Sequence, residues 1–395
     1  MNLKKQTSEN NKVIQLYKNK WNHFAKGRDK KRWLVSLGIL IFILVVILGI
    51  KYHVYHDYRV ISSANNEDTQ SAGYVQLGDG LLKYGDDGAY FLSQSQEILW
   101  NQTFEMSNPT ADVRGEQAVI YDQKGTKMFL LNKDKPVSDM ETKFPILQAE
   151  ITEKGSVAAI LEDGEKTWIN YYASDGTVIA ENQTRIENPG YPLDMTVSPG
   201  GETIAVSFLQ IDNGALVSRI VFYNFGDAGQ NKEDNIVADY EYENTIIPQV
   251  IYLDNETAVA FRDDGYSIFK GTESPQEKIK EVMEEEIVST FHDEKYFGLV
   301  MKGTDEKDSY VMQLYSPSGK KMFSKKIAHE YQSVDISDEM IVMYDGSDVK
   351  MYDLKGILKF DGTIEEGAVK NIFQMSSKRY IVISENGINT ISLKW

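Results

Sequence analysis

The fold is decided by a pattern that one stretch shows most clearly, Gln249-Val-Ile-Tyr-Leu-Asp-Asn-Glu-Thr-Ala-Val-Ala-Phe-Arg-Asp-Asp-Gly-Tyr-Ser-Ile-Phe-Lys270. It contains a weak first strand, a polar turn, the apolar run Ala258-Val-Ala-Phe261, an Asp264-Gly265 turn and an alternating segment. Short apolar runs separated by Asp, Asn and Gly are typical of β-strands joined by tight turns, because these residues tolerate the positive φ that hairpins need. The stretch therefore predicts β-hairpins.

The same arrangement recurs along the chain. Its other apolar runs are residues 81–84, 118–121, 157–161, 204–209, 297–301, 341–344 and 380–384. Counted from their first strands, the units begin near residues 74, 111, 148, 193, 249, 289, 333 and 371. A four-strand repeat of roughly 40 residues in an all-β chain predicts a β-propeller. A β-sandwich or tandem immunoglobulin-like domains would also be all-β, but neither predicts this repeat.

Eight units favour an eight-bladed ring, WD40-like or quinoprotein-like, over a seven-bladed alternative. We assign the propeller to residues 74–395. The last unit, from residue 371 onward, has room for only three strands. Its missing outer strand is expected from Tyr58-Arg-Val-Ile-Ser62, inside the juxtamembrane linker 52–73, and this strand would close the ring.

An apolar segment precedes the propeller. Residues 33–50 contain no charged side chain, and 18 residues would extend about 27 Å as a helix, close to the roughly 30 Å hydrocarbon core of a bilayer. Trp33 at one end and Tyr52 and Tyr55 at the other place amphipathic rings where the two interfaces should lie. No small-residue cleavage site follows, so residues 33–51 are predicted to be an uncleaved membrane anchor.

Charge is distributed unevenly along the chain. Residues 1–32 carry ten Lys or Arg against Glu9 and Asp29, whereas the whole chain has a net charge of −17. Because basic flanks stay in the cytoplasm, residues 1–32 are predicted to be a cytoplasmic tail and the propeller to lie outside the cell membrane. Residues 51–395 then carry −25, which disfavours nucleic acid as a ligand. The chain has no cysteine, which favours a bacterial rather than an animal outer domain.

The sequence offers little enzymatic chemistry. It contains no Gly-x-Ser-x-Gly, Gly-x-x-x-x-Gly-Lys-Ser/Thr or His-Glu-x-x-His motif. His53, His56 and Asp57 have a spacing that suits a metal, but they alternate with interface tyrosines, and no metal is expected there. His292 and His329 stand among charged residues and are expected at the exposed surface. The Asp-Gly turns lack the regularly spaced ligands of a calcium loop.

Two further features of the sequence could indicate a cofactor or a catalytic site. Trp100 resembles the tryptophans that dock neighbouring blades in quinoprotein-like propellers, but the other units lack it, so interblade packing explains it and no cofactor is expected. The outer domain contains 57 acidic residues, so some pair must fall at a separation that suits a glycosidase. Sequence gives no way to choose that pair.

The fourth unit is the longest and holds the predicted recognition surface. Its strands are expected near 193–197, 203–210, 217–224 and 236–242. Because antiparallel strands alternate ends, segments 189–194 and 211–215 should lie at one end of the blade and the polar loop 225–235 at the other. Long polar loops are common recognition elements, although a solvated excursion explains this loop equally well. The candidate residues are Tyr191, Asp194, Asp212, Asn213, Phe225, Asp227, Gln230, Asn231 and Asp234.

Four segments of the outer domain carry a resemblance to a known family. They are Leu77-Gly-Asp-Gly-Leu-Leu-Lys-Tyr84, Trp100-Asn-Gln-Thr-Phe-Glu-Met-Ser-Asn-Pro109, Gly190-Tyr-Pro-Leu-Asp194 and Phe222-Tyr-Asn-Phe-Gly-Asp-Ala-Gly-Gln-Asn231. With the N-terminal anchor, they resemble an uncharacterised family of membrane-anchored, propeller-like proteins of Gram-positive bacteria of the clostridial group. The resemblance covers nearly the whole outer domain and implies location and fold. It implies no catalytic residues, because the family is itself a domain of unknown function.

These observations favour a binding or scaffolding propeller over an enzyme. Anchored through residues 33–51, it would recognise an envelope protein or a wall component. One alternative is an extracytoplasmic hydrolase of wall glycan or peptide, which requires two close carboxylates with raised pKa values in a central cleft. Another is a sensor that signals to the cytoplasmic tail, in which residues 1–25 could form an amphipathic helix.

Overall fold

The computed structural model describes residues 27–64, 71–212, 214–303 and 310–394. The chain divides into two compact units, Met1–Val54 and Tyr55–Trp395. In the first unit, helix α2 spans Gly27–Lys51, and its segment Lys31–Lys51, with a mean hydropathy of 3.0, is long and apolar enough to cross a membrane. The amphipathic helix expected for residues 1–25 lies outside the described residues.

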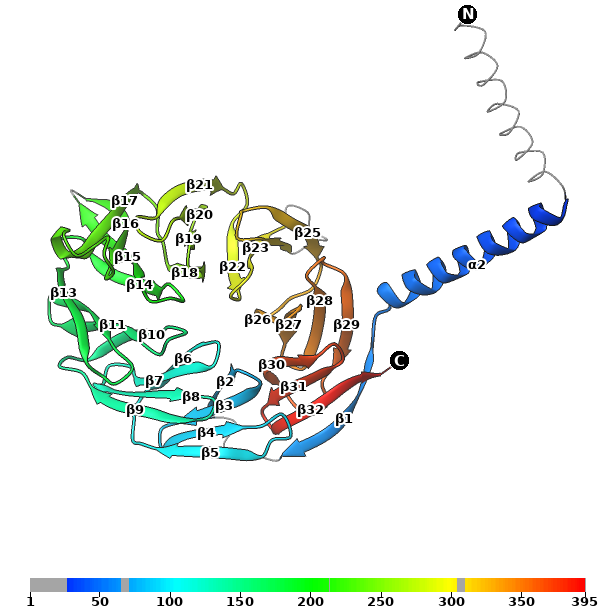
Figure 1. Cartoon of the computed structure of the whole chain (residues 1–395), viewed down its shortest axis with the longest axis horizontal. Coiled ribbons are helices and arrows are strands. Elements are labelled where there is room, and N and C mark those ends of the chain that lie inside the picture. The colour runs from blue at the N-terminus through cyan, green and yellow to red at the C-terminus, as the bar shows by residue number, and fades with distance from the viewer. Residues whose placement is uncertain (1–26, 65–70, 213, 304–309, 395) are drawn as a thin grey trace, which may run out of the picture. The chain divides into compact units, whose positions relative to one another are not determined.

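The described part of the second unit contains eight four-stranded antiparallel sheets around a common centre (Figure 1). Blades 1 to 4 consist of β2 (Gly73–Leu77), β3 (Gly80–Gly85), β4 (Gly88–Leu92) and β5 (Ile98–Thr103); β6 (Pro109–Arg114), β7 (Gln117–Asp122), β8 (Lys127–Asn132) and β9 (Lys135–Glu141); β10 (Ile146–Ile151), β11 (Val157–Asp163), β12 (Lys166–Tyr172) and β13 (Val178–Arg185); and β14 (Tyr191–Val197), β15 (Thr203–Asp212), β16 (Ala215–Asn224) and β17 (Ile236–Glu243), with the short helix η2 (Glu233–Asn235) before β17.

Blades 5 to 8 follow the same plan. They consist of β18 (Gln249–Asp254), β19 (Thr257–Arg262), β20 (Gly265–Lys270) and β21 (Gln276–Val282); β22 (Ile287–His292), β23 (Phe297–Lys302), β24 (Tyr310–Tyr315) and β25 (Lys321–Ile327); β26 (Ser333–Ser337), β27 (Met340–Asp345), β28 (Asp348–Asp353) and β29 (Leu358–Thr363); and β30 (Val369–Ser376), β31 (Arg379–Ser384), β32 (Gly387–Lys394) and β1 (Asp57–Ala64). The first strand of each blade lies nearest the centre (Figure 1). The predicted eight-bladed propeller is confirmed, and each first strand begins within two residues of its expected position.

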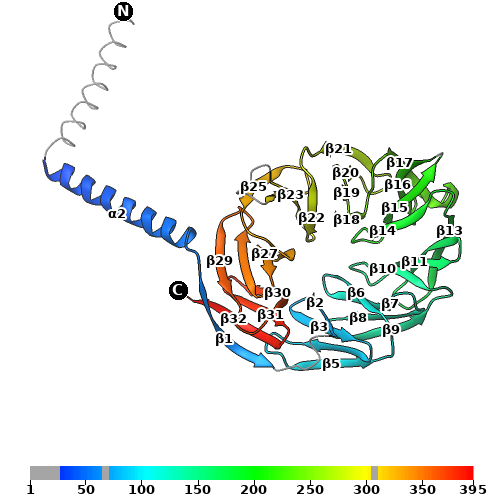
Figure 2. The ribbon, with the colours of Figure 1, turned by 180° about the vertical axis from the view of Figure 1, so that it is seen from behind.

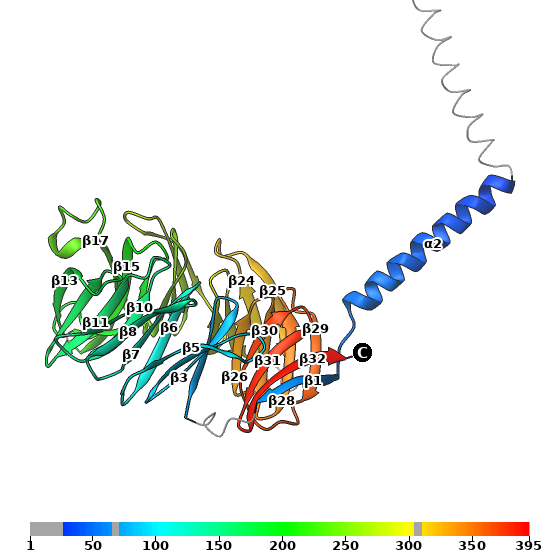
Figure 3. The same ribbon diagram turned by 60° about the horizontal axis from the view of Figure 1, so that its bottom comes forward.

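Blade 8 is built from both ends of the outer domain. Its sheet has the order β1-β32-β31-β30, so the strand that follows the apolar helix becomes the outer strand of the last blade. The pairing of β1 with β32 runs from Asp57 opposite Lys394 to Ala64 opposite Ile388. Figures 2 and 3 show β1 lying along β32. The segment 58–62, expected to supply the closing strand, lies within β1.

Neighbouring blades are held together by apolar side chains from both faces of their second strands. In β11, Val157, Ala159 and Leu161 pack toward blade 2, whereas Ala158 and Ile160 pack toward blade 4. A strand covered on both faces reads as a continuous apolar run instead of an alternating one. Among the described residues, eight such clusters join the blades pairwise, including blade 8 to blade 1, so the ring is closed.

The Asp264-Gly265 turn has structural requirements that both of its residues meet. A Cβ atom on Gly265 would collide with the backbone oxygen of Glu281 on the neighbouring strand β21. The Asp264 carboxylate accepts a hydrogen bond from Nε of Arg262 at 2.7 Å. The guanidinium of Arg262 is buried and also donates to Ser267 Oγ. Glycine therefore permits the close strand approach, and aspartate neutralises a buried cation.

Candidate functional site at the centre of the ring

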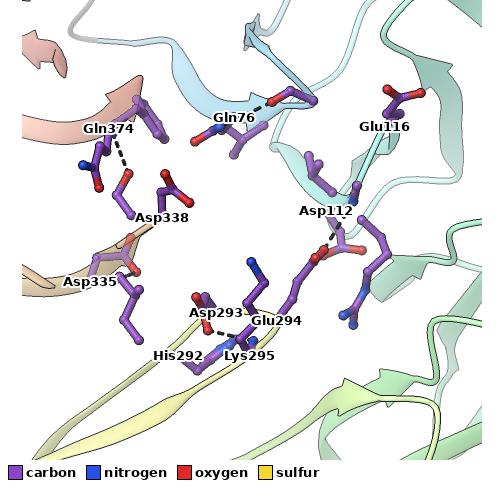
Figure 4. A pocket seen from close by; sticks show the side chains of 18 of the residues that line it. Gln76, Asp112, Glu116, His292, Asp293, Glu294, Lys295, Asp335, Asp338 and Gln374 are labelled. Carbon is purple, nitrogen blue, oxygen red and sulfur yellow. Dashed lines mark hydrogen bonds between the residues drawn. The ribbon is translucent and has the colours of Figure 1, made fainter. Parts of the chain in front are cut away.

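The inner strands and their first hairpins surround a cavity of about 900 Å³ (Figure 4). Every blade contributes to its wall. The acidic lining residues are Asp79, Asp112, Glu116, Glu150, Asp293, Glu294, Asp335 and Asp338, and the basic ones are Arg114 and Lys295. Apolar side chains such as Ile251, Ile336 and Phe373 complete the lining. The cavity is therefore a mixed site with an excess of negative charge.

Carboxylates lie on the inner strands because those strands are sheet edges. An edge strand presents backbone N–H groups that its own sheet does not satisfy. Asp112 accepts a hydrogen bond from the Ile151 N–H at 2.8 Å, which joins blade 2 to blade 3. Glu150 accepts one from Val197 N–H at 3.0 Å, which joins blade 3 to blade 4. These side chains therefore connect neighbouring blades by hydrogen bonds and also line the cavity.

Asp194 continues this series from blade 4 to blade 5. It accepts hydrogen bonds from the Val250 N–H and from Gln148 Nε2, each at 2.8 Å. Thr196 repeats the connection two residues further along β14 by accepting the Tyr252 N–H at 3.2 Å. Side-chain acceptors on β6, β10 and β14 thus satisfy the amides of the blade that follows each of them.

Burial shifts the acidity of these carboxyl groups. Desolvation raises the pKa of Asp112, and it raises the pKa of Glu150 well above its ordinary value, with a further contribution from the nearby charge of Asp112. Desolvation also raises the pKa of Asp194 to about 6. Arg114 opposes the shift at Asp112 and Glu150 because its positive charge stabilises their ionised forms.

Two hairpins approach each other across the cavity. Glu294, in the β22–β23 turn of blade 6, accepts a hydrogen bond from the Gly115 N–H of the β6–β7 turn in blade 2 at 3.3 Å. Arg114, beside Gly115, donates from Nη1 to the Tyr252 carbonyl oxygen of blade 5 at 3.3 Å. Figure 4 shows Glu294 extending toward the hairpin that carries Asp112. Blades 2 and 6 are opposite each other in an eight-membered ring, so the hydrogen bond between Gly115 and Glu294 spans it.

His292 also belongs to this site, and its expected position at the exposed surface was wrong. Its Nε2 atom lies 3.2 Å from Gln249 Nε2, and Gln249 Oε1 accepts a hydrogen bond from Thr290 Oγ1 at 2.9 Å. Burial, followed by the charge of Arg114, lowers the pKa of His292 to about 4. The imidazole is therefore neutral near pH 7. His329 is likewise half-buried, with Nε2 at 3.1 Å from the Tyr352 hydroxyl.

Asp335 is one of the exposed carboxylates of the cavity wall. It lies on β26 and is exposed, and its Oδ1 atom accepts a hydrogen bond from the N–H of the next residue, Ile336, at 2.8 Å. Desolvation of the carboxyl group, with a smaller contribution from the nearby charge of Asp293, raises the pKa of Asp335 to about 6. Asp112 and Glu150 accept hydrogen bonds from the next blade, whereas this hydrogen bond of Asp335 lies within its own strand and leaves the carboxylate accessible from the cavity.

The residues predicted as a recognition surface are spread over blade 4. Tyr191 and Asp212 lie exposed at one end of the blade, and Asn213 lies outside the described residues. At the other end, the exposed side chains are Asp227, Gln230, Asn231 and Asp234. Phe225 stacks on Tyr171 at 5.4 Å between the ring centroids and belongs to an interblade cluster.

As expected from the antiparallel pairing, the two loops lie at opposite ends of the blade, so these residues do not form one contiguous site. Asp194 is separate from both, on the inner strand, where its contacts are interblade hydrogen bonds. Trp100 was interpreted as an interblade residue, and this is confirmed because its Nε1 donates to the Lys133 carbonyl oxygen of blade 2 at 2.9 Å.

Sequence reasoning missed the cavity itself. The available signal was an acid inside the weak first strand of several units: Asp112, Glu150, Asp194 and Asp335. Considered alone, each of these residues is typical of a strand position whose side chain faces solvent. Only the closed ring brings these four inner strands around one centre.

The fold and the site together define an eight-bladed β-propeller with an acidic central cavity, on a chain that also carries an N-terminal apolar helix. The chain belongs to a family of unknown function (DUF5711), whose model matches residues 51–393. No curated protein sequence matches it.

Solved structures show the same fold at low sequence identity. BamB from Moraxella catarrhalis is 14% identical with a TM-score of 0.51, and the match covers 86% of this chain and all of that one. Sqt1 from Saccharomyces cerevisiae is 12% identical with a TM-score of 0.51, and the match covers 87% of this chain and all of that one. These similarities concern architecture alone.

Proposed function

We propose that the protein is a membrane-anchored binding or scaffolding propeller of the bacterial cell envelope, with a cytoplasmic N-terminus and an extracytoplasmic ring. Its partner would be an envelope protein or a wall component. The apolar segment Lys31–Lys51 and the basic residues before it support the anchorage and orientation. The propeller supports a binding role, since the centre and faces of such a ring form broad docking surfaces.

The observation that carries the binding role is the central cavity. Its wall offers more carboxylates than cations, and Asp335 and Asp338 are exposed there. A partner that presents basic side chains would complement this charge and form charge-assisted hydrogen bonds. We therefore place the docking point at the cavity and expect a basic segment of the partner to enter it.

The orientation has a direct test, because the chain contains no cysteine. Single cysteines placed at Ser8 and at Ser174 are treated in intact cells with a thiol reagent that does not cross membranes. We expect the cysteine at Ser174 to react and the one at Ser8 to be protected until the cells are lysed. Labelling only at Ser8 would reverse the proposed topology.

The docking point is tested with paired charge variants of the full chain in detergent. A fluorescent hexalysine peptide and a hexaglutamate control are titrated against the wild type. We expect Asp335→Asn with Asp338→Asn to weaken hexalysine binding at least fivefold. The matched control, Asp212→Asn with Asp227→Asn, makes the same charge change on the blade 4 loops and should have little effect.

The outcome of this comparison decides between two surfaces. Loss of binding in the loop variant alone would move the recognition site to blade 4. Equal binding by all three proteins, or no preference for hexalysine over hexaglutamate, would contradict a basic partner at the cavity. Capture from envelope extracts with the same three proteins then asks whether a natural partner follows the same pattern.

One observation also favours the second candidate function, a hydrolase. Asp112 and Glu150 are neighbouring cavity carboxylates whose pKa values are both raised, as a general acid requires. Each also accepts a backbone hydrogen bond from the next blade, which gives both a structural role. Release of soluble fragments from purified wall material by the wild type, but not by Glu150→Gln, would support catalysis. Equal release by both proteins would exclude these carboxylates as the catalytic pair.

A further inference from the structure

A cluster of positive charge lies at one end of blade 8, although the outer domain is strongly acidic. Arg59 on β1, Ser392 on β32 and Arg379 on β31 stand opposite one another across three adjacent strands. Residues directly opposite in antiparallel strands project from the same face of the sheet, and three strands span about 10 Å. Both arginines are exposed and therefore form a pair of cations on one face.

Two lysines extend this cluster. Lys394 follows Ser392 on β32 and is exposed, with Nζ at 3.3 Å from the Asp57 carboxylate. Lys378 precedes Arg379 and is exposed, with Nζ at 5.3 Å from the centroid of the Tyr55 ring. Asp57 is the carboxylate within the cluster. Four cations against one carboxylate give a net charge opposite in sign to the −25 of residues 51–395.

Exposed apolar side chains follow Arg59 along this outer edge strand. Val60 stands opposite the buried Ile391 and projects from the other face of the sheet, and Ile61 lies at the bulge before Ser62. Val60 and Ile61 of β1 are 42% and 45% exposed. Such residues beside Lys and Arg are typical of surfaces that lie at the headgroup level of a bilayer. We call this set, Arg59, Val60, Ile61, Lys378, Arg379 and Lys394, the β1 surface.

Chain connectivity limits how far the β1 surface is from the anchor along the polypeptide. Tyr55 is already fixed in the ring, because its N–H donates to the Lys359 carbonyl oxygen at 2.8 Å and its own oxygen accepts from the Asp361 N–H at 3.0 Å. Only residues 52–54 separate it from Lys51, the last residue of α2. The tether from Lys51 to Tyr55 is about 14 Å long when fully extended.

We propose that the β1 surface docks on the anionic lipid headgroups of the membrane in which the chain is anchored. This inference rests on the anchorage proposed above. A Lys or Arg near an anionic bilayer strengthens binding roughly fivefold, and Val60 and Ile61 add apolar contact. The remainder of the acidic domain is repelled by the same lipids, so attraction at one rim and repulsion elsewhere hold the ring in a single orientation.

The test uses the full chain in vesicles of phosphatidylcholine alone or with 30% phosphatidylglycerol. A cysteine at Ser377, an exposed residue of the β30–β31 turn beside Lys378, carries a fluorescent label. A second protein carries the label at Ser174, in the β12–β13 turn of blade 3. Quenching by a water-soluble quencher and by a lipid-bound quencher reports which label approaches the bilayer.

We expect the label at Ser377 to become shielded from the aqueous quencher and open to the lipid quencher only in anionic vesicles and only at low salt. The label at Ser174 should stay aqueous in both. Arg59→Gln with Arg379→Gln should lower the docked-to-undocked ratio about 25-fold, since two fivefold contributions are lost. The matched control, Lys154→Gln with Lys166→Gln, removes two exposed cations from blade 3 and should leave the ratio unchanged.

Equal quenching at Ser377 in neutral and anionic vesicles would overturn the proposal. So would an equal effect of the two double variants, because the response would then follow net charge instead of the β1 surface. Flotation of the vesicles separates this result from a failure of anchorage. A chain that does not float with the vesicles lacks a membrane anchor, whereas one that floats but shows no lipid-dependent quenching is anchored without docking.

Discussion

The contacts of Tyr58 lead to a quantitative prediction about how the ring is closed. The Tyr58 hydroxyl donates to Glu366 Oε2 at 2.6 Å and accepts from the Glu365 N–H at 2.8 Å, and both partners lie between β29 and β30. The ring of Tyr58 packs on the cluster between blades 7 and 8. Tyr58→Phe keeps the packing and removes both hydrogen bonds, so it tests their contribution to holding β1 in place.

The expected size of the effect follows from the partners. A hydrogen bond to a carboxylate contributes about 1.5–3 kcal/mol and one to a neutral amide about 1 kcal/mol when the groups are sheltered from water. Glu365 is exposed and Glu366 is half-exposed, so water replaces part of what is lost. We therefore expect a net loss of about 1–2 kcal/mol, confined to the closing strand, because local opening does not require the other blades to unfold.

Hydrogen exchange measured by mass spectrometry reports this quantity directly. A loss of 1–2 kcal/mol should speed amide exchange in β1 about 5- to 30-fold. Tyr310→Phe is the matched control, because the Tyr310 hydroxyl donates to Glu330 Oε2 at the same 2.6 Å but lies in blade 6. Tyr58→Phe should accelerate exchange in β1 and not in blade 6, and Tyr310→Phe should do the reverse. Exchange in β1 that changes less than twofold in Tyr58→Phe would refute the reasoning.

Three further predictions concern the interblade hydrogen bonds of Asp194 and the buried Arg262 of blade 5. Asp194→Ala should lower the free energy of unfolding by about 2–3 kcal/mol because the buried Val250 N–H loses its acceptor, whereas Asp194→Asn, which keeps an acceptor oxygen, should cost less than half as much in urea unfolding. The pKa of Asp194 is raised from 3.8 to about 6 in the folded state, so the folded chain binds a proton at this carboxyl group more tightly than the unfolded chain does. Its contribution to the free energy of unfolding is therefore fully present below about pH 4 and is lost as the pH rises through about 6. The difference between wild type and Asp194→Asn should therefore change between pH 4 and pH 7, and a parallel pair of unfolding curves across that range would contradict the assignment. Arg262→Ala should destabilise blade 5 by about 3–5 kcal/mol, measured by thermal unfolding, because the buried hydrogen bonds to Asp264, Ser267 and the Glu281 carbonyl oxygen are lost. Arg262→Lys should recover only part of this loss, because Lys cannot make all three hydrogen bonds. An unchanged melting temperature in Arg262→Ala would show that these contacts do not stabilise the blade.

Much of the architecture could be read before the structure was known, because β-strand patterns are local. The second strand of each blade is covered on both faces, so it appears as an uninterrupted apolar run such as residues 157–161. Asp-Gly pairs mark turns because their backbone requirements are also local. For the same reason the four strands of blade 4 were predicted to within about two residues at nearly every boundary.

Longer-range features were less accessible. His292 was expected at the surface because its neighbours in sequence are charged, yet Gln249 from the preceding blade covers it. The opposite ends of the blade 4 loops, by contrast, were predicted, because antiparallel pairing within one blade is local. A sequence shows which side chains are polar, and it does not show which backbone amides of another blade need them as acceptors.

The sequence by itself determined the repeat, the strand order, the apolar helix and the sign of the charge on each side of it, because each depends on residues close together in the chain. Only the tertiary structure decided that Asp112 and Glu150 line one cavity, that Asp194 joins blade 4 to blade 5, and that Arg59 and Arg379 meet at the rim. Closure of the ring decides these contacts, since it brings together strands that are far apart in the chain, up to the first and the last strand of the outer domain. The edge amides of the inner strands then fix where the carboxylates must lie.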